Sequence, residues 1–298
     1  MMLSRRRFLT LTAAATLAAP ARAAPIRWQG FAMGAECQLT LHAPPEQARA
    51  AIARIRAMLT RTEALFSLYD PTSQLSRLNR TGHLRRPPPE MTQILAQANR
   101  VHGATQGRFD PTVQPLWQAL ARNHDPAPAR ARIGWQHVRR QPDQITLAPG
   151  QALTLNGIAQ GFATDRARDI LRQMGLTRVL INMGEFAALG GAFRMGLSDP
   201  ARGLFATQPL QDQAMATSSP GALSLGAQSH ILDPTGQGPL WSTVTVTGRS
   251  ATLADAASTA FCLMTRSQIA TALDSLPELT QVTMLPATGP AQQIRRPQ

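Results

Sequence analysis

The chain has 298 residues, of which 43% are hydrophobic, so it can form one large domain or two small ones with real cores. Its formal charge is +13, and all 30 basic residues are arginine. The arginines are scattered, and no basic run is interleaved with aromatic residues as a nucleic-acid surface requires. This pattern excludes a typical nucleic-acid-binding protein, while a basic surface still favours anionic ligands.

The N-terminus has the pattern of an export signal. Residues 4–9 read Ser-Arg-Arg-Arg-Phe-Leu, an apolar region follows to about Ala19, and Ala21-Arg22-Ala23 forms a small-x-small cleavage site. The apolar run is too short for a permanent membrane-spanning helix, and no cysteine stands at the cleavage site for a lipid anchor. We therefore expect a twin-arginine signal peptide over residues 1–24, a mature domain over 25–298, and a periplasmic protein without a stable membrane anchor.

The two cysteines, Cys37 and Cys262, do not form a disulfide framework or a metal site. An oxidising compartment permits a bond between them. However, Cys37 falls on the apolar side of an alternating run, and Cys262 stands between Phe261 and Leu263. This setting favours two buried thiols.

Hydrophobic periodicity and turn residues predict the elements of the first half of the chain. These are strands over 26–42 broken at Met33-Gly34, a helix over 44–64, a turn at Asp70-Pro71 with a short helix capped by Thr72 or Ser73, a proline-rich loop over 82–89, a helix over 90–103, a turn over 107–117 leading into a short helix, a polar loop over 123–131, and short strands over 138–155.

The same reasoning places the remaining elements. These are a helix that begins at the glycine turn and runs to 172, a buried strand over 178–183, a loop over 184–191, a strand over 192–197, a small polar loop over 215–221, a turn over 229–236, a strand over 242–247, a helix over 251–264, a helix over 269–276, and a strand over 280–285. The irregular mixture of strands and helices indicates an α+β fold rather than a doubly wound sheet.

The stretch from Leu155 to Arg172 combines a turn carrying Gly157 and Gly161 with an amphipathic helix. Glycine lets backbone approach a ligand closely, and a helix N-terminus offers unpaired N–H groups and a positive dipole end. The combination suits a phosphate or pyrophosphate. Close packing of the turn against a neighbouring element explains the same pattern, so both interpretations stay open.

Two further groups are candidates for chemistry. His230 stands between Ser229 and the Asp233-Pro234 turn, where a side chain can be directed into a cleft, whereas no two of the six histidines have metal-ligand spacing. Asp255 and Thr259 are four residues apart and share a helix face. Their oxygens suit Mg²⁺, although an acidic residue in the first turn of a helix also stabilises the helix.

No serine-hydrolase elbow, Walker pattern or dinucleotide fingerprint is present. Instead, eight segments in this order resemble the ApbE family of FAD:protein FMN transferases. They are Phe31–Gly34, Ser67–Asn79, Gly107–Leu116, Leu155–Asp165, Asn182–Glu185, Met215–Ser218, Ser229–Pro234 and Ala254–Ala260. They are spread over nearly all of residues 25–298, and their shared order makes the resemblance specific.

The resemblance implies a single α+β domain of two lobes, with mixed sheets, flanking helices and a flavin site in the cleft between the lobes. It also implies an enzyme that binds FAD and Mg²⁺, moves FMN onto a Thr hydroxyl of a target flavoprotein and releases AMP. Some members instead hydrolyse FAD to FMN and AMP. Family members with twin-arginine signals can serve respiratory reductases, including those of nitrous-oxide respiration. The resemblance therefore implies a membrane respiratory subunit as the acceptor.

The resemblance assigns roles to individual residues. The catalytic base is His230. The metal positions are the Gly157 carbonyl, Asp255 and Thr259, with Ser258 beside them. The FAD-contacting positions are Met33, Tyr69, Arg108, Phe109, Asp110, Thr154 and Gln160.

Three positions depart from the family pattern. Thr154 stands where an Asp is frequent, Asn156 replaces the first glycine of a pair, and Gln160 replaces a common Lys. The changes at 154 and 160 predict altered phosphate or flavin contacts. Beside the transferase, two alternatives follow: an FAD pyrophosphatase, and a non-catalytic flavin-binding maturation factor of the periplasm.

Overall fold

The computed structural model describes residues 24–296. The predicted signal peptide therefore lies outside the described residues, apart from its last position. Within the described range no helix is both long and apolar enough to cross a membrane.

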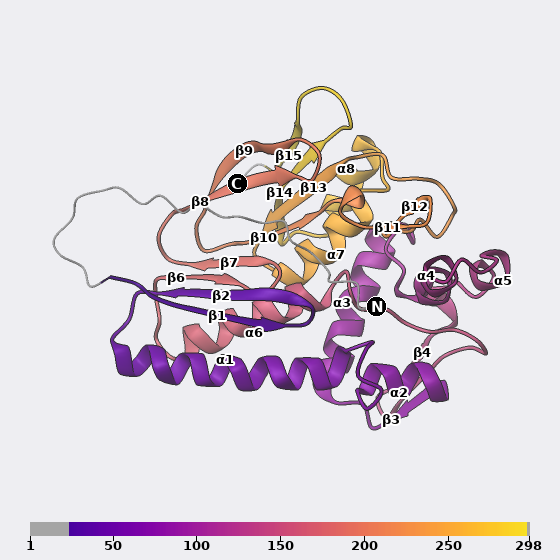
Figure 1. Ribbon diagram of the computed structural model, residues 1–298, viewed down its shortest axis with the longest axis horizontal. Helices are drawn as coiled ribbons and strands as arrows, with labels where there is room; N and C mark the ends of the chain where they lie inside the picture. The colour runs from indigo at the N-terminus through magenta and orange to yellow at the C-terminus, as the bar shows by residue number, and fades with distance from the viewer. Residues whose placement is uncertain (1–23, 297–298) are drawn as a thin grey trace.

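An eight-stranded sheet forms the centre of the molecule (Figure 1). Its strand order is β1-β2-β6-β7-β10-β13-β14-β15, and each pairing between these neighbours is antiparallel. The strands are β1 (Ile26–Ala32), β2 (Ala35–Leu41), β6 (Val179–Asn182), β7 (Phe186–Leu189), β10 (Ala214–Ser218), β13 (Thr243–Gly248), β14 (Leu279–Leu285) and β15 (Gln292–Arg295). The expected α+β class is confirmed, with the refinement that this sheet is antiparallel throughout.

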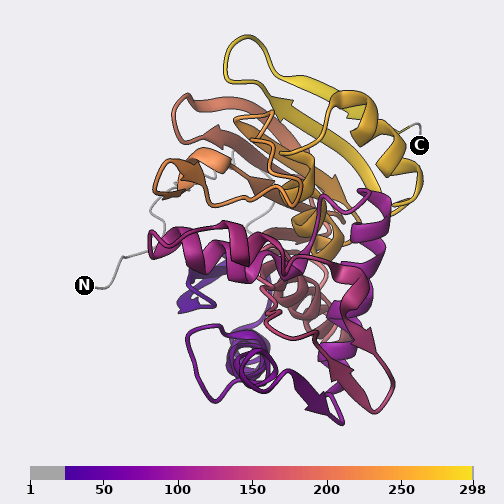
Figure 2. The same ribbon diagram turned by 90° about the vertical axis from the view of Figure 1, so that its right-hand side faces the viewer.

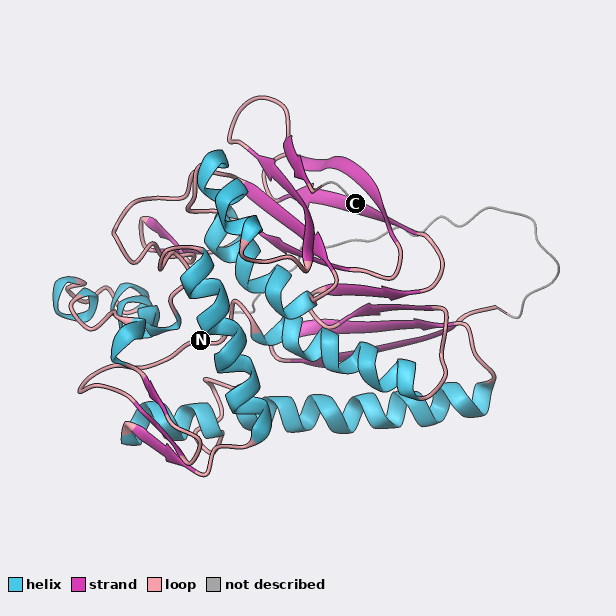
Figure 3. Cartoon of the chain, turned by 180° about the vertical axis from the view of Figure 1, so that it is seen from behind, coloured by secondary structure: helices cyan, strands magenta, loops and turns pink. Residues whose placement is uncertain are grey.

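Helices cover one face of the sheet, as the view from behind shows (Figure 3). They are α1 (Pro45–Phe66), α6 (Ala159–Gln173), α7 (Ala251–Phe261) and α8 (Arg266–Asp274). The amphipathic faces of α1 and α6 join β2 and β6 in one buried hydrophobic cluster, while α7 is buried along nearly its whole length. This layer fixes where the N-terminal ends of α6 and α7 meet.

A hairpin of β8 (Phe193–Asp199) and β9 (Gly203–Leu210) covers the opposite face. The hairpin buries the second face of β7 and of β13. All four residues of β7 and all six residues of β13 are buried. The threonines of β13 point into this layer, where Thr243 donates to Asp199 at 2.7 Å. The centre of the sheet is thus covered on both sides, and its polar side chains are paired there.

Residues 74–156, here called the small lobe, lie between α1 and α6 in sequence. They form the end of the molecule at the right of Figure 1, which faces the viewer in Figure 2. The lobe consists of α2 (Gln74–Thr81), β3 (His83–Arg85), α3 (Pro89–Ala104), η1 (Pro111–Val113), α4 (Gln114–Ala121), α5 (Ala127–Arg130), η2 (Trp135–His137), β4 (Arg139–Arg140) and β5 (Gln144–Thr146). Its core is continuous with α7, so α3 places the lobe against the helix that carries Asp255.

Several expectations for individual elements are confirmed. Ser73 caps α2 by accepting from the N–H of Ser76, and Ser250 caps α7 by accepting from the N–H of Leu253. Cys37 and Cys262 are free and buried.

Other expectations were wrong at segments of small residues. The expected loop over 215–221 begins as the central strand β10, and the expected loop over 184–191 contains β7. The loops over 82–89 and 123–131 contain β3 and α5. At β7 and β10 the residues pair with neighbouring strands and are largely buried, which local polarity does not show. The elements β3 and α5 are short, and each buries a single residue. The strands β9, β11 (Ser224–Leu225), β12 (Gln228–Ser229) and β15 and the short helix η3 (Pro220–Ala222) were not predicted.

Candidate active site

A cluster of oxygen atoms lies where α7 meets the end of β10. Asp255 is only 3% exposed, and its Oδ2 accepts from the N–H of Gly161 at 2.9 Å. Ser258 and Thr259 donate to the carbonyl of Asp255 at 3.0 and 3.2 Å. The hydroxyl of Ser218 lies 2.8 Å from that of Ser258 and 3.3 Å from that of Thr259. The hydroxyls of Ser218, Ser258 and Thr259 therefore lie together, and the carboxylate of Asp255 starts from the same face of α7 as Thr259.

The glycine turn before α6 lies directly on this cluster. A Cβ added at Gly157 would lie 3.0 Å from Oγ1 of Thr259 and 3.5 Å from the ring of Phe109. The structure thus brings together the four residues that the resemblance assigned to a metal, Gly157, Asp255, Ser258 and Thr259. Phe109 borders the same place.

Gly161 has a packing role. A Cβ at this position would come within 2.3 Å of the carbonyl oxygen of Ala251 and 2.7 Å of Cβ of Asp255. Only glycine allows α6 to approach α7 so closely. The packing interpretation of the glycine-rich stretch is therefore confirmed at Gly161. The phosphate-binding interpretation stays a prediction, for which Gly157 beside Thr259 is the relevant position.

The oxygen cluster has the donor types that Mg²⁺ prefers. Among residues 24–296 no group of three His, Cys, Asp or Glu side chains could hold a metal ion. A cation beside Asp255 would therefore be held by one carboxylate and neutral oxygens, and by waters or ligand phosphates. Mg²⁺ is commonly bound in this way, whereas structural zinc requires several His or Cys ligands. The residues present fit Mg²⁺.

His230 lies in the loop that follows β12. Its backbone N–H and its ring Nδ1 both contact the carbonyl of Leu223, at 3.1 and 3.0 Å. A carbonyl can only accept, so Nδ1 carries a hydrogen, and in the neutral ring Nε2 then carries the lone pair. That tautomer is the one required of a base acting through Nε2.

One short loop links the oxygen cluster to His230. Ser218 at its start belongs to the cluster, the carbonyl of Pro220 accepts from the hydroxyl of Ser229 at 3.1 Å, and Leu223 holds His230. Residues 218–223 therefore tie the two parts of the site to each other. Ser218 was not a predicted site residue, since a small hydroxyl at a strand end is not distinctive in sequence.

Arg108 anchors the His230 loop from the small lobe. Its Nη1 donates to the carboxylate of Asp233, and to the hydroxyl of Thr235 at 2.7 Å. The Asp233 side chain is fully buried. The resemblance gave Arg108 to FAD, but in this structure the guanidinium pairs with the protein. Asp233 was expected only as part of the turn beside His230, and its ion pair with Arg108 was not indicated by the sequence.

Asp110 shapes a turn of a type that occurs three times in the chain. In each Asp-Pro-Thr unit, at Asp70, Asp110 and Asp233, Oδ1 of the aspartate accepts from the N–H of the threonine at 2.7–2.8 Å and from its hydroxyl at 2.6–2.8 Å. Oδ2 of Asp110 also accepts from the N–H of Trp135 at 3.2 Å. The Asp110 carboxylate thus holds the turn that presents Phe109.

Met33 and Tyr69 both lie beside the end of α1. Met33, with φ 53°, and Gly34, with φ 74°, form the two-residue turn between β1 and β2. The N–H of Met33 donates to Glu63 of α1 at 2.8 Å. Tyr69 follows α1 and is 67% exposed. An exposed ring at this position is available for stacking on a flat ligand.

Of the three departing positions, Thr154 and Gln160 differ in their surroundings. The N–H of Thr154 donates to Pro111 at 2.8 Å, and its hydroxyl accepts from the N–H of Asn156 at 3.2 Å. Gln160 is buried, and its side-chain amide carbon would lie 2.5 Å from a Cβ added at Gly184. Thr154 therefore shapes the turn before Gly157, whereas Gln160 packs into the interior.

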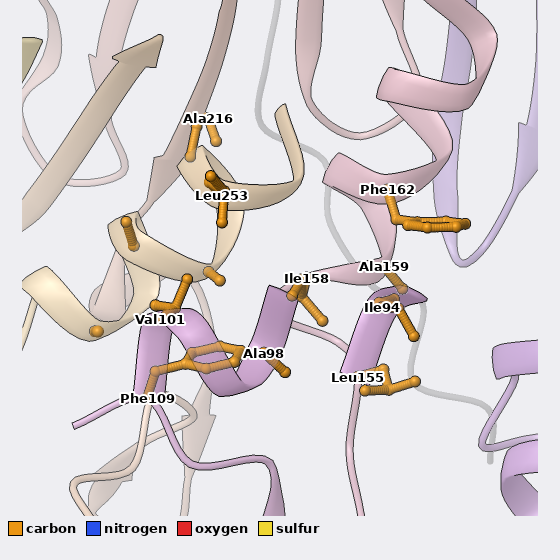
Figure 4. Packing of buried hydrophobic residues seen from close by; sticks show 14 of the residues in the cluster. Ile94, Ala98, Val101, Phe109, Leu155, Ile158, Ala159, Phe162, Ala216 and Leu253 are labelled. Atoms are coloured by element: carbon orange, nitrogen blue, oxygen red, sulfur yellow. The ribbon is translucent and has the colours of Figure 1, made fainter. Parts of the chain in front are cut away.

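A continuous hydrophobic layer supports the site from below (Figure 4). Phe109 lies beside Val101 and Ala98 of α3, while Ile158 and Phe162 belong to the start of α6. This packing connects the residues on either side of the glycine turn to α3.

The family model of the ApbE family matches residues 33–284. The chain belongs to the ApbE family. Two curated relatives described as FAD:protein FMN transferase come from Klebsiella pneumoniae and Chlamydia trachomatis. The first is 27% identical over 70% of this chain and 72% of its own, and the second is 28% identical over 75% and 78%.

Solved ApbE structures share the fold. The flavin transferase ApbE from Vibrio cholerae is 21% identical, with a TM-score of 0.77 over 91% of this chain and 96% of its own. The ApbE protein from Thermotoga maritima is 22% identical, with a TM-score of 0.79 over 90% and 96%. At these identities the structures establish the ApbE fold for this chain.

Proposed function

We propose that this chain is an FAD:protein FMN transferase that moves FMN from FAD to a Thr hydroxyl of an acceptor flavoprotein, with Mg²⁺, and releases AMP. The observation that carries the proposal is the convergence of Gly157, Asp255 and Thr259, linked by residues 218–223 to His230. Curated relatives described as FAD:protein FMN transferase support the class of reaction.

The reaction replaces one phosphorus–oxygen bond by another. The acceptor oxygen bonds to the phosphorus of the FMN half, the bond from that phosphorus to the bridging oxygen breaks, and AMP leaves with the bonding electron pair. A hydroxyl is a poor nucleophile at neutral pH. Nε2 of His230, with Nδ1 held by Leu223, takes the hydroxyl proton, a contribution of about 10²- to 10⁴-fold.

Asp255, Thr259, Ser258 and the Gly157 carbonyl would hold the cation. When bound, Mg²⁺ neutralises charge on the pyrophosphate oxygens. The protein itself contributes a water-poor wall, because Phe109 is buried beside Gly157. Arg108 contributes indirectly, by fixing the loop that carries His230 through Asp233.

The acceptor and the compartment extend the proposal. The twin-arginine pattern of residues 4–9 supports export to the periplasm, and the acceptor is then an exported flavoprotein, for which a membrane respiratory subunit is our candidate. Mass spectrometry of proteins pulled down with the enzyme tests this, since a flavinylated membrane subunit among them is the expected result.

The reaction class is tested by incubating the protein with FAD and Mg²⁺, with and without a Thr-bearing flavoprotein domain that another transferase modifies. We expect covalent flavin and AMP only when the acceptor is present. Equal release of FMN and AMP without acceptor would instead show a pyrophosphatase. Tight FAD binding without turnover, unchanged in His230→Ala, would show a flavin carrier.

A further inference from the structure

The small lobe carries most of the net positive charge of the described chain. Residues 74–156 contain eleven arginines and four acidic residues, whereas the rest of residues 24–296 contains fifteen and thirteen. The excess is therefore local, although the arginines are dispersed in sequence. A local field of one sign indicates a partner of the opposite sign.

A cavity of about 710 Å³ opens in this lobe, between α2, β3, β5 and α4. Three exposed arginines line it, Arg80, Arg85 and Arg132, and no acidic residue is among its lining. Across residues 24–296 no carboxylate lies within 4.0 Å of any of these three guanidinium groups. Within the described residues these three arginines therefore form no ion pair and can bind carboxylates of a partner.

Two of these arginines are held at the cavity wall. Arg80 donates to the carbonyl of Pro71 at 3.0 Å. The side chain of Arg132 lies over Gly150, because a Cβ added at Gly150 would be 2.8 Å from Nε of Arg132. Hydroxyls and amides, including those of Thr146 and Gln118, complete the lining. Charged groups combined with neutral donors and acceptors suit a peptide better than a bare ion.

The cavity adjoins the active-site turn without sharing its residues. Asn79, which lines it, accepts from the N–H of Leu153 at 2.7 Å and donates to the carbonyl of Leu153 at 2.8 Å. The next residue is Thr154, and Gly157 follows three positions later. A segment bound in the cavity therefore lies next to the chain that leads into the site.

We infer that this cavity docks an acidic segment of the acceptor protein, an inference that rests on the proposed transferase function. A protein acceptor must be oriented so that one hydroxyl reaches the site, and charge complementarity provides orientation and a faster encounter. Binding to a membrane surface commonly adds apolar insertion to basic charge. The exposed large hydrophobic residues of the described chain, Phe31, Tyr69, Leu204 and Leu240, lie outside the small lobe.

The probe for a test is a fluorescein-labelled hexaglutamate peptide, with hexaglutamine as its control. The test variant is Arg80→Gln/Arg85→Gln/Arg132→Gln. The matched control removes three charges from α1, as Arg49→Gln/Arg54→Gln/Arg56→Gln. Fluorescence anisotropy should show salt-sensitive binding to the full chain, weakened about tenfold or more in the test variant and less than twofold in the control.

Catalysis separates this inference from the function on which it rests. In the test variant we expect FAD binding to be unchanged, and the KM for the acceptor domain to rise with little change in kcat. Equal weakening of hexaglutamate binding in both triple variants would overturn the inference. So would an unchanged KM in the test variant, or retention by vesicles of anionic lipid without hexaglutamate binding. If the wild type transfers no FMN at all, the proposed function fails while the anisotropy result still decides what the cavity binds.

Discussion

Asp255 has two tasks, since its carboxylate accepts from the N–H of Gly161 and belongs to the oxygen cluster beside Gly157. The variant Asp255→Asn separates these tasks, because an amide oxygen still accepts the hydrogen bond but carries no charge. We expect transfer to fall by roughly 10²-fold or more. The free energy of unfolding should change by no more than about 1 kcal/mol.

Initial rates measured over a range of Mg²⁺ concentrations, together with urea unfolding, check this prediction. Wild-type rates in Asp255→Asn would show that the carboxylate serves only to hold α6. A large loss in the free energy of unfolding would show that the charge of the carboxylate is needed to hold α6, which contradicts the expected separation of the two tasks.

Arg108 and Asp233 form a pair that is mostly buried, because their side chains are 16% and 0% exposed. Arg108→Met leaves the buried carboxylate without its cation, which costs about 3–5 kcal/mol of unfolding free energy. The matched control is Arg61→Met, which breaks an ion pair with Glu90 at an arginine that is 59% exposed. That loss should be below about 1 kcal/mol.

Urea unfolding compares the two variants directly. Because Arg108 holds the His230 loop, its replacement should also lower kcat more than it weakens FAD binding. Similar stability losses in both variants would contradict the structural distinction between them.

Sequence reasoning named residues that the structure brings together, such as Gly157 and Thr259, but not the residues that support them. The positions Gly157, Asp255 and Thr259 converge because the turn before α6 packs against the face of α7 on which Asp255 and Thr259 lie one helical turn apart. The roles of Ser218 and Asp233 depend on contacts between segments far apart in the chain. Such contacts are set by tertiary packing and leave no local pattern.

At the scale of elements, the crossing of α6 and α7 depends on Gly161. Gly161→Ala places a methyl group 2.3 Å from a backbone oxygen that cannot move without shifting α7. We expect a loss of about 1–3 kcal/mol or more in unfolding free energy. Activity should fall as well, since Asp255 lies at the same contact.

Gly103→Ala is the matched control for this substitution. Gly103 lies in α3 and is exposed, and no atom lies within 4 Å of an added Cβ. Alanine should therefore stabilise the helix by up to about 1 kcal/mol. Thermal unfolding of both variants gives the comparison, and a shift of the same sign in both would contradict the packing argument.

Elements with clear periodicity could be predicted, and elements determined by burial could not. The long helices α1 and α3 and the alternating strand β13 lie close to their expected bounds. The strand β10 was expected to be a loop because Thr217 and Ser218 are polar. Its polar atoms are satisfied across the sheet, for instance between the hydroxyls of Thr217 and Thr245 at 2.9 Å.

For the whole molecule, the buried thiols determine how stability depends on alkaline pH. Burial raises the pKa of Cys37 from 9.0 to about 11, and burial also raises the pKa of Cys262. Below pH 9 the thiols are protonated in both the folded and the unfolded chain, so their contribution to stability is complete. As pH rises from 9 toward the folded pKa, the thiols of the unfolded chain ionise first, and this contribution is lost. The chain has no lysine, and its one tyrosine, Tyr69, is exposed, so few other groups interfere.

We expect the free energy of unfolding to fall above pH 9, by up to about 1.4 kcal/mol per pH unit for each thiol. The double variant Cys37→Ala/Cys262→Ala should show a shallower slope. Urea titrations at about pH 8, 9 and 10 measure the slope of the unfolding free energy against pH. An identical slope in both proteins would contradict this assignment.

The acceptor-flavinylation assay tests the central claim most directly. The full chain is incubated with FAD, Mg²⁺ and the Thr-bearing acceptor domain, and the acceptor is analysed by peptide mass spectrometry, with His230→Gln in parallel. We predict one FMN group on one threonine, with a rate about 10²- to 10⁴-fold lower in His230→Gln. An acceptor that remains unmodified by this chain, although another transferase modifies it, would contradict the account.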